Sequence, residues 1–190
     1  GSLVYGFDRL TMNEEGNRKA IIVQGNIPQD VKWDEAFKTK TIRTYFEKTA
    51  EAGRGADLIV WPETAMPFVF DEEPGLSRFV KELPALLRAD LLFGTVSRDS
   101  SGKFYNSAYI YGKEGKLAGA YRKVHLVPFG EYTPLVSYFP FLVRMTAAGG
   151  DFHPGESHNP IETAAGKIGV LICYEGIFPS ITNDTVKKGA

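Results

Sequence analysis

The sequence has one cysteine, almost no net charge and no long apolar run, and each shortage excludes a class of protein. Cys173 has no second cysteine to pair with among the 190 residues, so the chain holds no intrachain disulfide. A formal net charge of −1 gives no basis for binding nucleic acid. No stretch reaches the roughly 18 apolar residues of a membrane span, and no signal peptide or glycine-rich phosphate loop is present. We therefore expect this chain by itself to be soluble and to use no cofactor.

The chain is expected to be a short entry segment followed by one folded unit. Residues 1–18 carry little pattern, whereas residues 19–190 contain apolar runs separated by turn-forming residues. The hydrophobic content of 43% is ordinary for a globular domain. Gly1 and Ser2 are typical of a cloning scar, which would make the chain an excised piece of a longer protein.

The pattern of apolar runs predicts an α/β fold with a mixed sheet. Strand–helix–strand order at the front predicts parallel pairs, and three consecutive strands in the middle predict an antiparallel meander beside them. A helix over residues 76–88 should break or start late because of Pro84. The long segment 125–162 carries no clear element and is a candidate lid or substrate surface. Predicted strands cover residues 19–27, 57–61, 91–97, 104–111, 117–124 and 169–172, and further helices cover 35–52 and a segment from 179.

Three residues with complementary chemistry lie at or near the carboxyl ends of predicted strands: Glu63, Lys123 and Cys173. In open α/β sheets this edge is where ligands bind, so the three side chains could share one crevice. There Glu63 could act as a general base, Lys123 could stabilise a thiolate and an oxyanion, and Cys173 could be the nucleophile. The alternatives are an inert core cysteine and two solvated surface charges.

The wording of the sequence around these residues favours the catalytic interpretation. WPETAMPF at Glu63, YRKVHLVPFGEYTP at Lys123 and GVLICYEGIFPS at Cys173 resemble, in order, the signatures of the nitrilase (carbon–nitrogen hydrolase) superfamily. The resemblance implies a four-layer αββα sandwich with a Glu–Lys–Cys triad. HLVPFGEYTP, CYE and QGNIPQDVKWD narrow it to the apolipoprotein N-acyltransferase family. Soluble amidases of the superfamily instead tend to carry an Asp and an Arg after the cysteine.

The resemblance also implies supporting residues around the triad. Glu131 and Glu175 would line the site and support it, and Tyr174 and Trp33 match positions that matter for the family's activity. Simpler interpretations remain for each. Trp33 could pack on Phe37 at a helix entry, Tyr174 could be a buried aromatic residue, and both glutamates could be surface charges.

The activity implied by the resemblance is a two-step acyl transfer. Cys173 would take a fatty acyl chain from a phospholipid as a thioester, and the N-terminal amine of a diacylglyceryl-cysteine apolipoprotein would then receive it. The longer parent protein would sit in the bacterial inner membrane through its own helices, with this domain on the periplasmic side. Two apolar segments, 66–70 and 138–145, could provide an approach for lipid, or could pack into the core.

The sequence also offers a possible metal site and two alternative functions. His153, Glu156 and His158 lie close in sequence, but their loose spacing in a Pro/Gly-rich segment predicts a solvated loop and no metal. The chain also ends before the superfamily pattern does, so the sandwich is expected to be incomplete at its C-terminus. The alternative functions are a soluble amidase acting on a small amide and an inactive fragment that serves only as a binding module.

Overall fold

The computed structural model describes residues 3–4, 7, 17–28, 32–33, 35–52, 54–132 and 152–190, and its centre is one six-stranded sheet. The strand order is β1-β2-β4-β5-β6, and β3 also pairs with β4. The first four strands are mutually parallel and β4, β5 and β6 are antiparallel, so the predicted mixed sheet is confirmed. The strands are β1 (Ala20–Ile22), β2 (Leu58–Val60), β3 (Met66–Val69), β4 (Asp90–Arg98), β5 (Phe104–Tyr111) and β6 (Leu117–Arg122).

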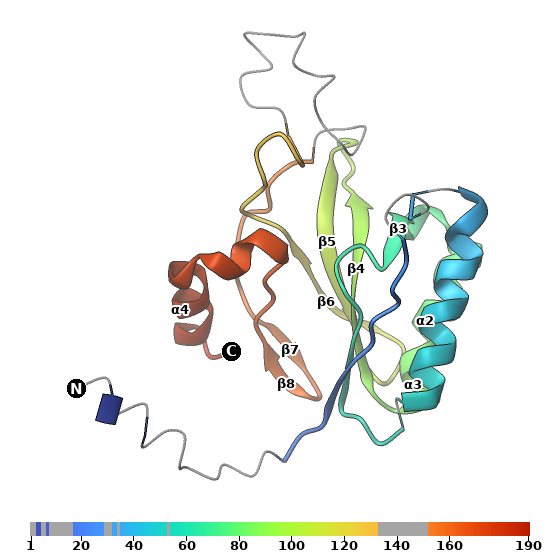
Figure 1. Cartoon of the computed structure of the whole chain (residues 1–190), viewed down its shortest axis with the longest axis horizontal. Helices are drawn as coiled ribbons and strands as arrows, with labels where there is room; N and C mark the ends of the chain where they lie inside the picture. Colours follow the sequence, from blue (N-terminus) through green and yellow to red (C-terminus); the bar gives the residue numbers. More distant parts are fainter. Residues whose placement is uncertain are drawn as a thin grey trace, which may run out of the picture.

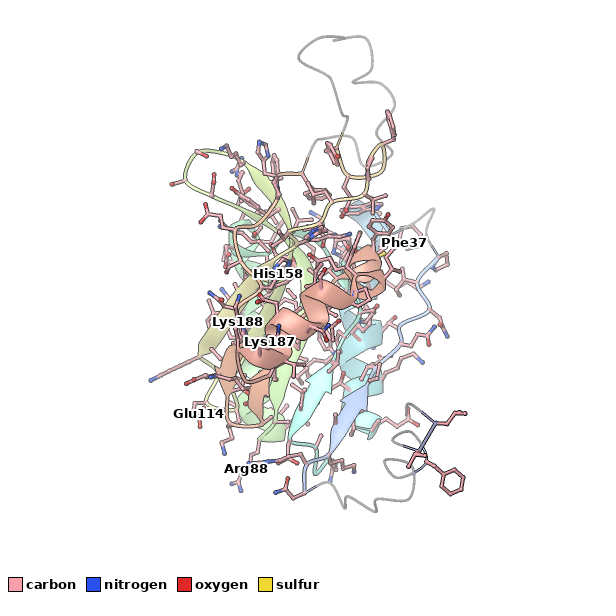
Figure 2. All side chains as sticks on the ribbon, turned by 90° about the vertical axis from the view of Figure 1, so that its left-hand side faces the viewer. Phe37, Arg88, Glu114, His158, Lys187 and Lys188 are labelled. Atoms are coloured by element: carbon pink, nitrogen blue, oxygen red, sulfur yellow. The ribbon has the colours of Figure 1, made fainter. Side chains whose placement is uncertain are left out.

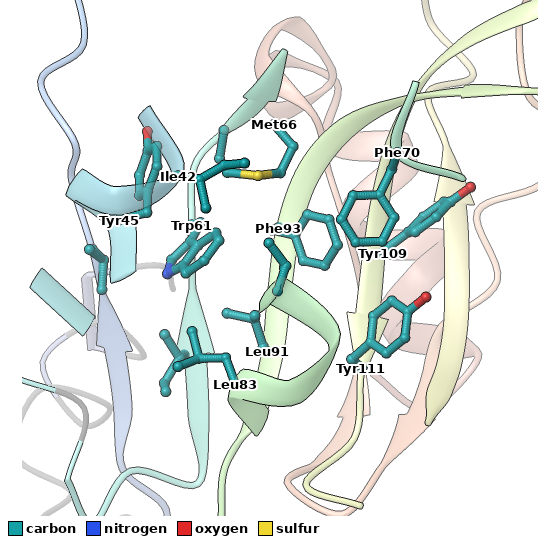
Figure 3. Packing of buried hydrophobic residues seen from close by; sticks show 14 of the residues in the cluster. Ile42, Tyr45, Trp61, Met66, Phe70, Leu83, Leu91, Phe93, Tyr109 and Tyr111 are labelled. Carbon is teal, nitrogen blue, oxygen red and sulfur yellow. The ribbon is translucent and has the colours of Figure 1, made fainter. Parts of the chain in front are cut away.

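Two helices cover one face of this sheet and bury an aromatic core against it (Figures 1 and 3). They are α2 (Lys38–Ala52), which follows the 3₁₀ turn η1 (Glu35–Phe37), and α3 (Pro74–Leu87), which follows η2 (Phe70–Glu72). The Trp61 ring stacks on Tyr45 with ring centroids 5.1 Å apart, and its indole N–H donates to Thr49. Phe70 and Phe93 are fully buried beside it, so this face carries the larger core.

The helix α3 runs through the proline that was expected to break or delay it. It begins at Pro74, two residues before the predicted start, and continues past Pro84 to Leu87. A proline at the first helical position is favourable because its missing N–H would be unpaired in any case. Pro84 is buried in the last turn, where the cost of a lost hydrogen bond is local.

The opposite face of the sheet is covered by a hairpin and then by a third helix. The hairpin joins β7 (Ile161–Thr163) to β8 (Gly166–Ile168), and Ile161 packs with Ile110 and Tyr121 of the sheet. Outside it lies α4 (Pro179–Lys187) (Figure 1). The order helix, sheet, hairpin, helix is that of the predicted αββα sandwich, whose second β layer is the hairpin in the described part of the chain.

Several predicted elements were wrong in detail. Residues 169–172 form no strand with any described residue; they run extended with Val170 and Ile172 buried, because a strand needs a hydrogen-bonded neighbour. The hairpin was missed altogether. Residues 66–70 are the strand β3 and the start of η2, and pack mainly into the core, which removes them as a lipid approach. The other lipid candidate, 138–145, lies outside the described residues.

None of the helices in the described ranges has both the length and the apolar character that crossing a bilayer requires.

Candidate active site

The ammonium group of Lys123 lies buried between two carboxylates at the end of β6. Its side chain is 1% exposed, and Nζ is 2.7 Å from Oε2 of Glu131 and 3.8 Å from Oε1 of Glu63. A buried cation is costly unless opposite charges and hydrogen bonds surround it. The two glutamates supply that compensation, so the surface-charge interpretation of Glu131 is wrong.

An asparagine that the sequence analysis missed connects the same two carboxylates. The side-chain amide of Asn106, on β5, donates to Oε1 of Glu63 and to Oε1 of Glu131, each at 2.7 Å. Its backbone carbonyl accepts the N–H of Lys123 at 2.9 Å. The available signal was an asparagine within an otherwise strand-forming run, FYNSAYIY, where a polar side chain is unfavourable unless it has buried partners.

Glu63 lies on a tight turn between β2 and β3, two strands that both pair with β4. β2 pairs with residues 90–92 of β4 and β3 pairs with residues 95 and 96, so the turn at Glu63 crosses β4 at Gly94. A Cβ atom at Gly94 would lie 2.4 to 2.7 Å from backbone atoms of the turn, so glycine is required there. Thr64 adopts a φ of +51°, and Lys32 donates to the Glu63 carbonyl at 3.2 Å.

The Cys173 side chain meets this group from the other side of the site. Cys173 begins the 3₁₀ turn η4 (Cys173–Ile177) with a φ of +52°, a left-handed conformation that is costly for a residue other than glycine. Its thiol lies close to the Glu63 carboxylate and is solvent-accessible. Burial and the negative charge of Glu63 raise the pKa of Cys173 above its ordinary value, and Lys123 only partly offsets them. Lys123 favours the thiolate, as expected, but more weakly than burial and Glu63 oppose it, so the resting group is a thiol that needs a base.

Glu175 is a buried brace between the two halves of the site. One of its oxygens accepts hydrogen bonds from the Tyr121 hydroxyl and from the N–H groups of Val124 and His125, at 2.7 to 3.1 Å. The other accepts the N–H of Ile172 at 2.9 Å. This side chain is 0% exposed, so it supports the site from beneath and is not a surface charge. It ties the chain after Lys123 to the chain before Cys173.

The two aromatic candidates are exposed near the site. Tyr174 is 39% exposed and contacts Phe178 edge-on with ring centroids 5.1 Å apart, so it is not a buried aromatic residue. Trp33 is 47% exposed and adjoins Lys32, whose side chain reaches the Glu63 turn. Both aromatic faces are thus accessible to a ligand.

Residues 19–190 match the sequence model of a family described as carbon–nitrogen hydrolase. The chain belongs to the carbon–nitrogen hydrolase family. It is 38% identical over 195 residues to an apolipoprotein N-acyltransferase of Geobacter metallireducens and 36% identical over 204 residues to one of Allorhizobium ampelinum. Both alignments cover the whole of this chain, but it spans only 37% and 38% of the length of these relatives.

Solved structures of carbon–nitrogen hydrolases share the fold of this chain. A carbon–nitrogen hydrolase of Helicobacter pylori aligns with a TM-score of 0.63 at 20% identity, covering 90% of this chain and 56% of that one. Nit3 of Saccharomyces cerevisiae, a member of the nitrilase superfamily, aligns with a TM-score of 0.58 at 24% identity, covering 82% and 55%. At these identities the likeness establishes the architecture alone.

The arrangement in this carbon–nitrogen hydrolase chain has the parts that acyl transfer through a thioester requires. A thiol beside a carboxylate can lose its proton to that carboxylate as it attacks a carbonyl. A neighbouring ammonium group can stabilise the negative oxygen that develops. The left-handed backbone at Cys173 presents the sulfur at the start of a turn, where it is open to a substrate.

Two histidines lie close to Glu175, but the three residues together are poorly suited to bind a metal ion. Among the described residues, His125, His158 and Glu175 bring their ligand atoms within 4.8 Å of one another. His153 and Glu156, which precede His158 in sequence, are not in this group. Both oxygens of Glu175 already accept hydrogen bonds, four in all, so a metal would have to displace buried N–H or O–H donors. His158 lies on the side of the molecule that carries α4 (Figure 2).

Proposed function

We propose that this chain is the catalytic domain of an acyltransferase that moves a fatty acyl chain from a phospholipid to the N-terminal amine of a diacylglyceryl-cysteine apolipoprotein. The observation that carries the proposal is the convergence of Glu63, Lys123 and Cys173 in a chain that aligns over its whole length with apolipoprotein N-acyltransferases. No observation favours a small amide as substrate over an acyl ester.

In the first step the Cys173 sulfur attacks the carbonyl carbon of a phospholipid ester while its proton passes to the Glu63 carboxylate. The carbonyl oxygen becomes an oxyanion, which the Lys123 ammonium group stabilises. When the intermediate collapses, the ester C–O bond breaks and Glu63 returns the proton to the departing alkoxide. The products are a lysophospholipid and an acyl thioester on Cys173.

In the second step the α-amine of the apolipoprotein attacks the thioester carbonyl. Glu63 accepts a proton from the amine, the C–S bond breaks, and the sulfur of Cys173 leaves and is reprotonated. The product is an N-acylated lipoprotein. Glu131 keeps Lys123 in place through its 2.7 Å contact, and Glu175 maintains the distance between Lys123 and Cys173.

The lipid nature of both substrates implies that the longer parent works at a membrane. We propose that this parent is held in the bacterial inner membrane by its own helices and presents the domain on the periplasmic side. Tyr174 and Trp33 are proposed to contact the substrates, because both are exposed aromatic residues that adjoin residues of the site in sequence, Cys173 and Lys32.

The test is the intact mass of the protein after incubation with a phospholipid in detergent. The chain and its full-length parent are compared, each with the Cys173→Ala variant. We expect the mass of one acyl chain to be added to the parent, to be absent from the variant, and to disappear when an amine acceptor is supplied. Ser157→Ala, at an exposed position, is the matched control and should be acylated normally.

Three results separate the alternatives. An adduct on the parent alone would mean that parts beyond this chain complete the site. Ammonia released from simple amides without any acyl adduct would replace the proposal with an amidase. Silence of the parent in both assays would leave the non-catalytic binding module.

A further inference from the structure

The carboxylates of Glu63 and Glu131 are held together by more than the lysine between them. Lys123 supplies one positive charge for two negative ones, and its Nζ is 3.8 Å from Glu63, beyond a normal hydrogen bond. Lys123 therefore attracts Glu63 without fixing its orientation. A base that must point at a thiol needs a directional contact as well.

Asn106 provides that directional contact. Its side-chain nitrogen carries two hydrogens, and each is directed at a different carboxylate, at 2.7 Å in both cases. The opposite orientation of the amide would place its oxygen against two carboxylate oxygens and is therefore excluded. Asn106 is also 5% exposed, so water does not compete for these hydrogen bonds.

The arrangement leaves a buried acceptor unsatisfied. Oδ1 of Asn106 is buried and has no hydrogen-bond partner among the described residues. An unpaired buried carbonyl oxygen costs free energy, and an apolar side chain of the same volume would avoid that cost. The two hydrogen bonds that the amide donates to Glu63 and Glu131 offset this cost.

Asn106 also fixes the third member of the group through its backbone. Its carbonyl accepts the N–H of Lys123, so one residue orients the carboxylates with its side chain and the lysine with its main chain. It does this from β5, a strand that pairs with β4 on one edge and β6 on the other.

We propose that Asn106 is a positioning residue that holds Glu63 against the Cys173 thiol and keeps the two glutamates together around Lys123. This inference rests on the proposed role of Glu63 as the base. Asn106 itself contacts Glu63, Glu131 and Lys123 and is not assigned any contact with the substrate.

The first experiment measures how the rate of Cys173 alkylation by iodoacetamide depends on pH in the 190-residue chain, so it does not depend on acyl transfer. Glu63 raises the pKa of the thiol, so a variant in which Glu63 turns away should alkylate with a lower midpoint. Asn106→Leu, which removes both donors at similar volume, is expected to lower the midpoint. Asn106→Asp, which adds a negative charge in the same shape, is expected to raise it.

The matched control is Ser107→Ala on the same strand. Ser107 points to the opposite face of the sheet and its hydroxyl pairs with Ser97 at 2.7 Å, so its loss should leave the midpoint unchanged. An unchanged midpoint in folded Asn106→Leu would overturn the proposal. If Asn106→Leu does not fold, the test uses Asn106→Asp, and an unchanged pH midpoint of alkylation in that variant would also overturn the proposal.

The second experiment measures acyl-adduct formation by the full-length parent carrying the same variants. Asn106→Leu should slow the step by about tenfold to a hundredfold at saturating phospholipid, with little change in the lipid concentration giving half the maximal rate. A change confined to that concentration would contradict a positioning role. If no variant or parent forms an adduct, the proposed function fails while the alkylation result still tests Asn106.

Discussion

The two halves of the candidate site are built to different degrees of rigidity. Glu63, Lys123 and Asn106 lie on or next to strands of the six-stranded sheet, and buried hydrogen bonds join them. Cys173 follows an extended segment without a described strand partner and begins a strained turn. The proposed base, Glu63, and the proposed oxyanion stabiliser, Lys123, are therefore held by the sheet, whereas the turn of the proposed nucleophile, Cys173, is held by the hydrogen bonds of Glu175.

This difference identifies Glu175 as the most sensitive point outside the triad. A single carboxylate accepts four hydrogen bonds from donors on two segments of the chain, 121–125 and Ile172. Glu63, Lys123 and Asn106 are held by several hydrogen bonds and ion pairs, so the loss of one contact leaves others in place. The segment around Cys173 has few such contacts, so we expect substitutions near it to change the position of the thiol.

The largest stability effect is expected for Glu175→Gln. The amide NH₂ must face at least one of the N–H or O–H donors that now point at the carboxylate, so a buried donor becomes unpaired. We expect a loss of about 3 kcal/mol in the free energy of unfolding, measured by urea denaturation. Hydrogen exchange at the Ile172 amide should accelerate more than exchange in β5.

The control for this prediction is Glu162→Gln. The Glu162 side chain is 83% exposed, and its salt bridge to Lys167 is solvated. Its loss should change stability by less than about 0.5 kcal/mol. Equal effects of the two substitutions would show that Glu175 does not brace the site.

A smaller loss of stability is expected when a side chain is added at Gly94, beside the turn that carries Glu63. Gly94→Ala places a Cβ atom within 2.7 Å of the backbone around Glu63, so the turn must shift. We expect a loss of about 2 kcal/mol in stability and slower acylation of the parent. Gly75→Ala, where a Cβ atom meets nothing within 4 Å, should leave stability unchanged or raise it by under about 1 kcal/mol. Comparable losses in both would contradict the assigned role of Gly94.

The electrostatic effect of Glu63 on Cys173 can be tested in one variant, for which we expect alkylation to become faster and acylation slower. Glu63→Gln removes the negative charge that raises the pKa of Cys173, so iodoacetamide should alkylate the thiol faster at pH 8. The same variant should slow acylation of the parent by about a hundredfold or more, because the base is lost. Wild-type Cys173 should alkylate more slowly than a free cysteine, with a midpoint above its ordinary value of about 9. A fall in both rates would indicate that Glu63 acts only by holding the structure.

The loops that carry the triad could be predicted because each follows a short apolar run bounded by a turn. Trp61 before Pro62, and Leu171–Ile172 before Cys173, mark such ends in the sequence alone. Family resemblance added the roles that position could not give. The mixed sheet followed from the order and spacing of the runs.

The missed features depend on partners that are distant in sequence. β3 contains Pro67, a residue that is uncommon in strands, and its pairing with β4 spans only a few residues. Asn106 was missed because its carboxylate partners, Glu63 and Glu131, lie 43 and 25 residues away in the sequence. Local pattern marks Asn106 as an unusual residue within a strand, but it does not identify the carboxylates that the side chain contacts.

The smallest expected effect is a pH dependence of stability that arises behind Glu175. Burial lowers the pKa of His158 although Glu175 and Asp184 favour its charged form, while His125 and Lys188 oppose it. The folded state thus favours the neutral imidazole, so its contribution to stability is complete above the ordinary pKa of about 6.5 and is lost as the pH falls through the lower value in the fold. Urea midpoints measured from pH 8 to pH 5 should therefore decline, and His158→Asn should flatten part of that decline. An unchanged slope in the variant would assign the acid sensitivity to other groups, and would mean that the histidine beside the brace does not influence how firmly the nucleophile half is held.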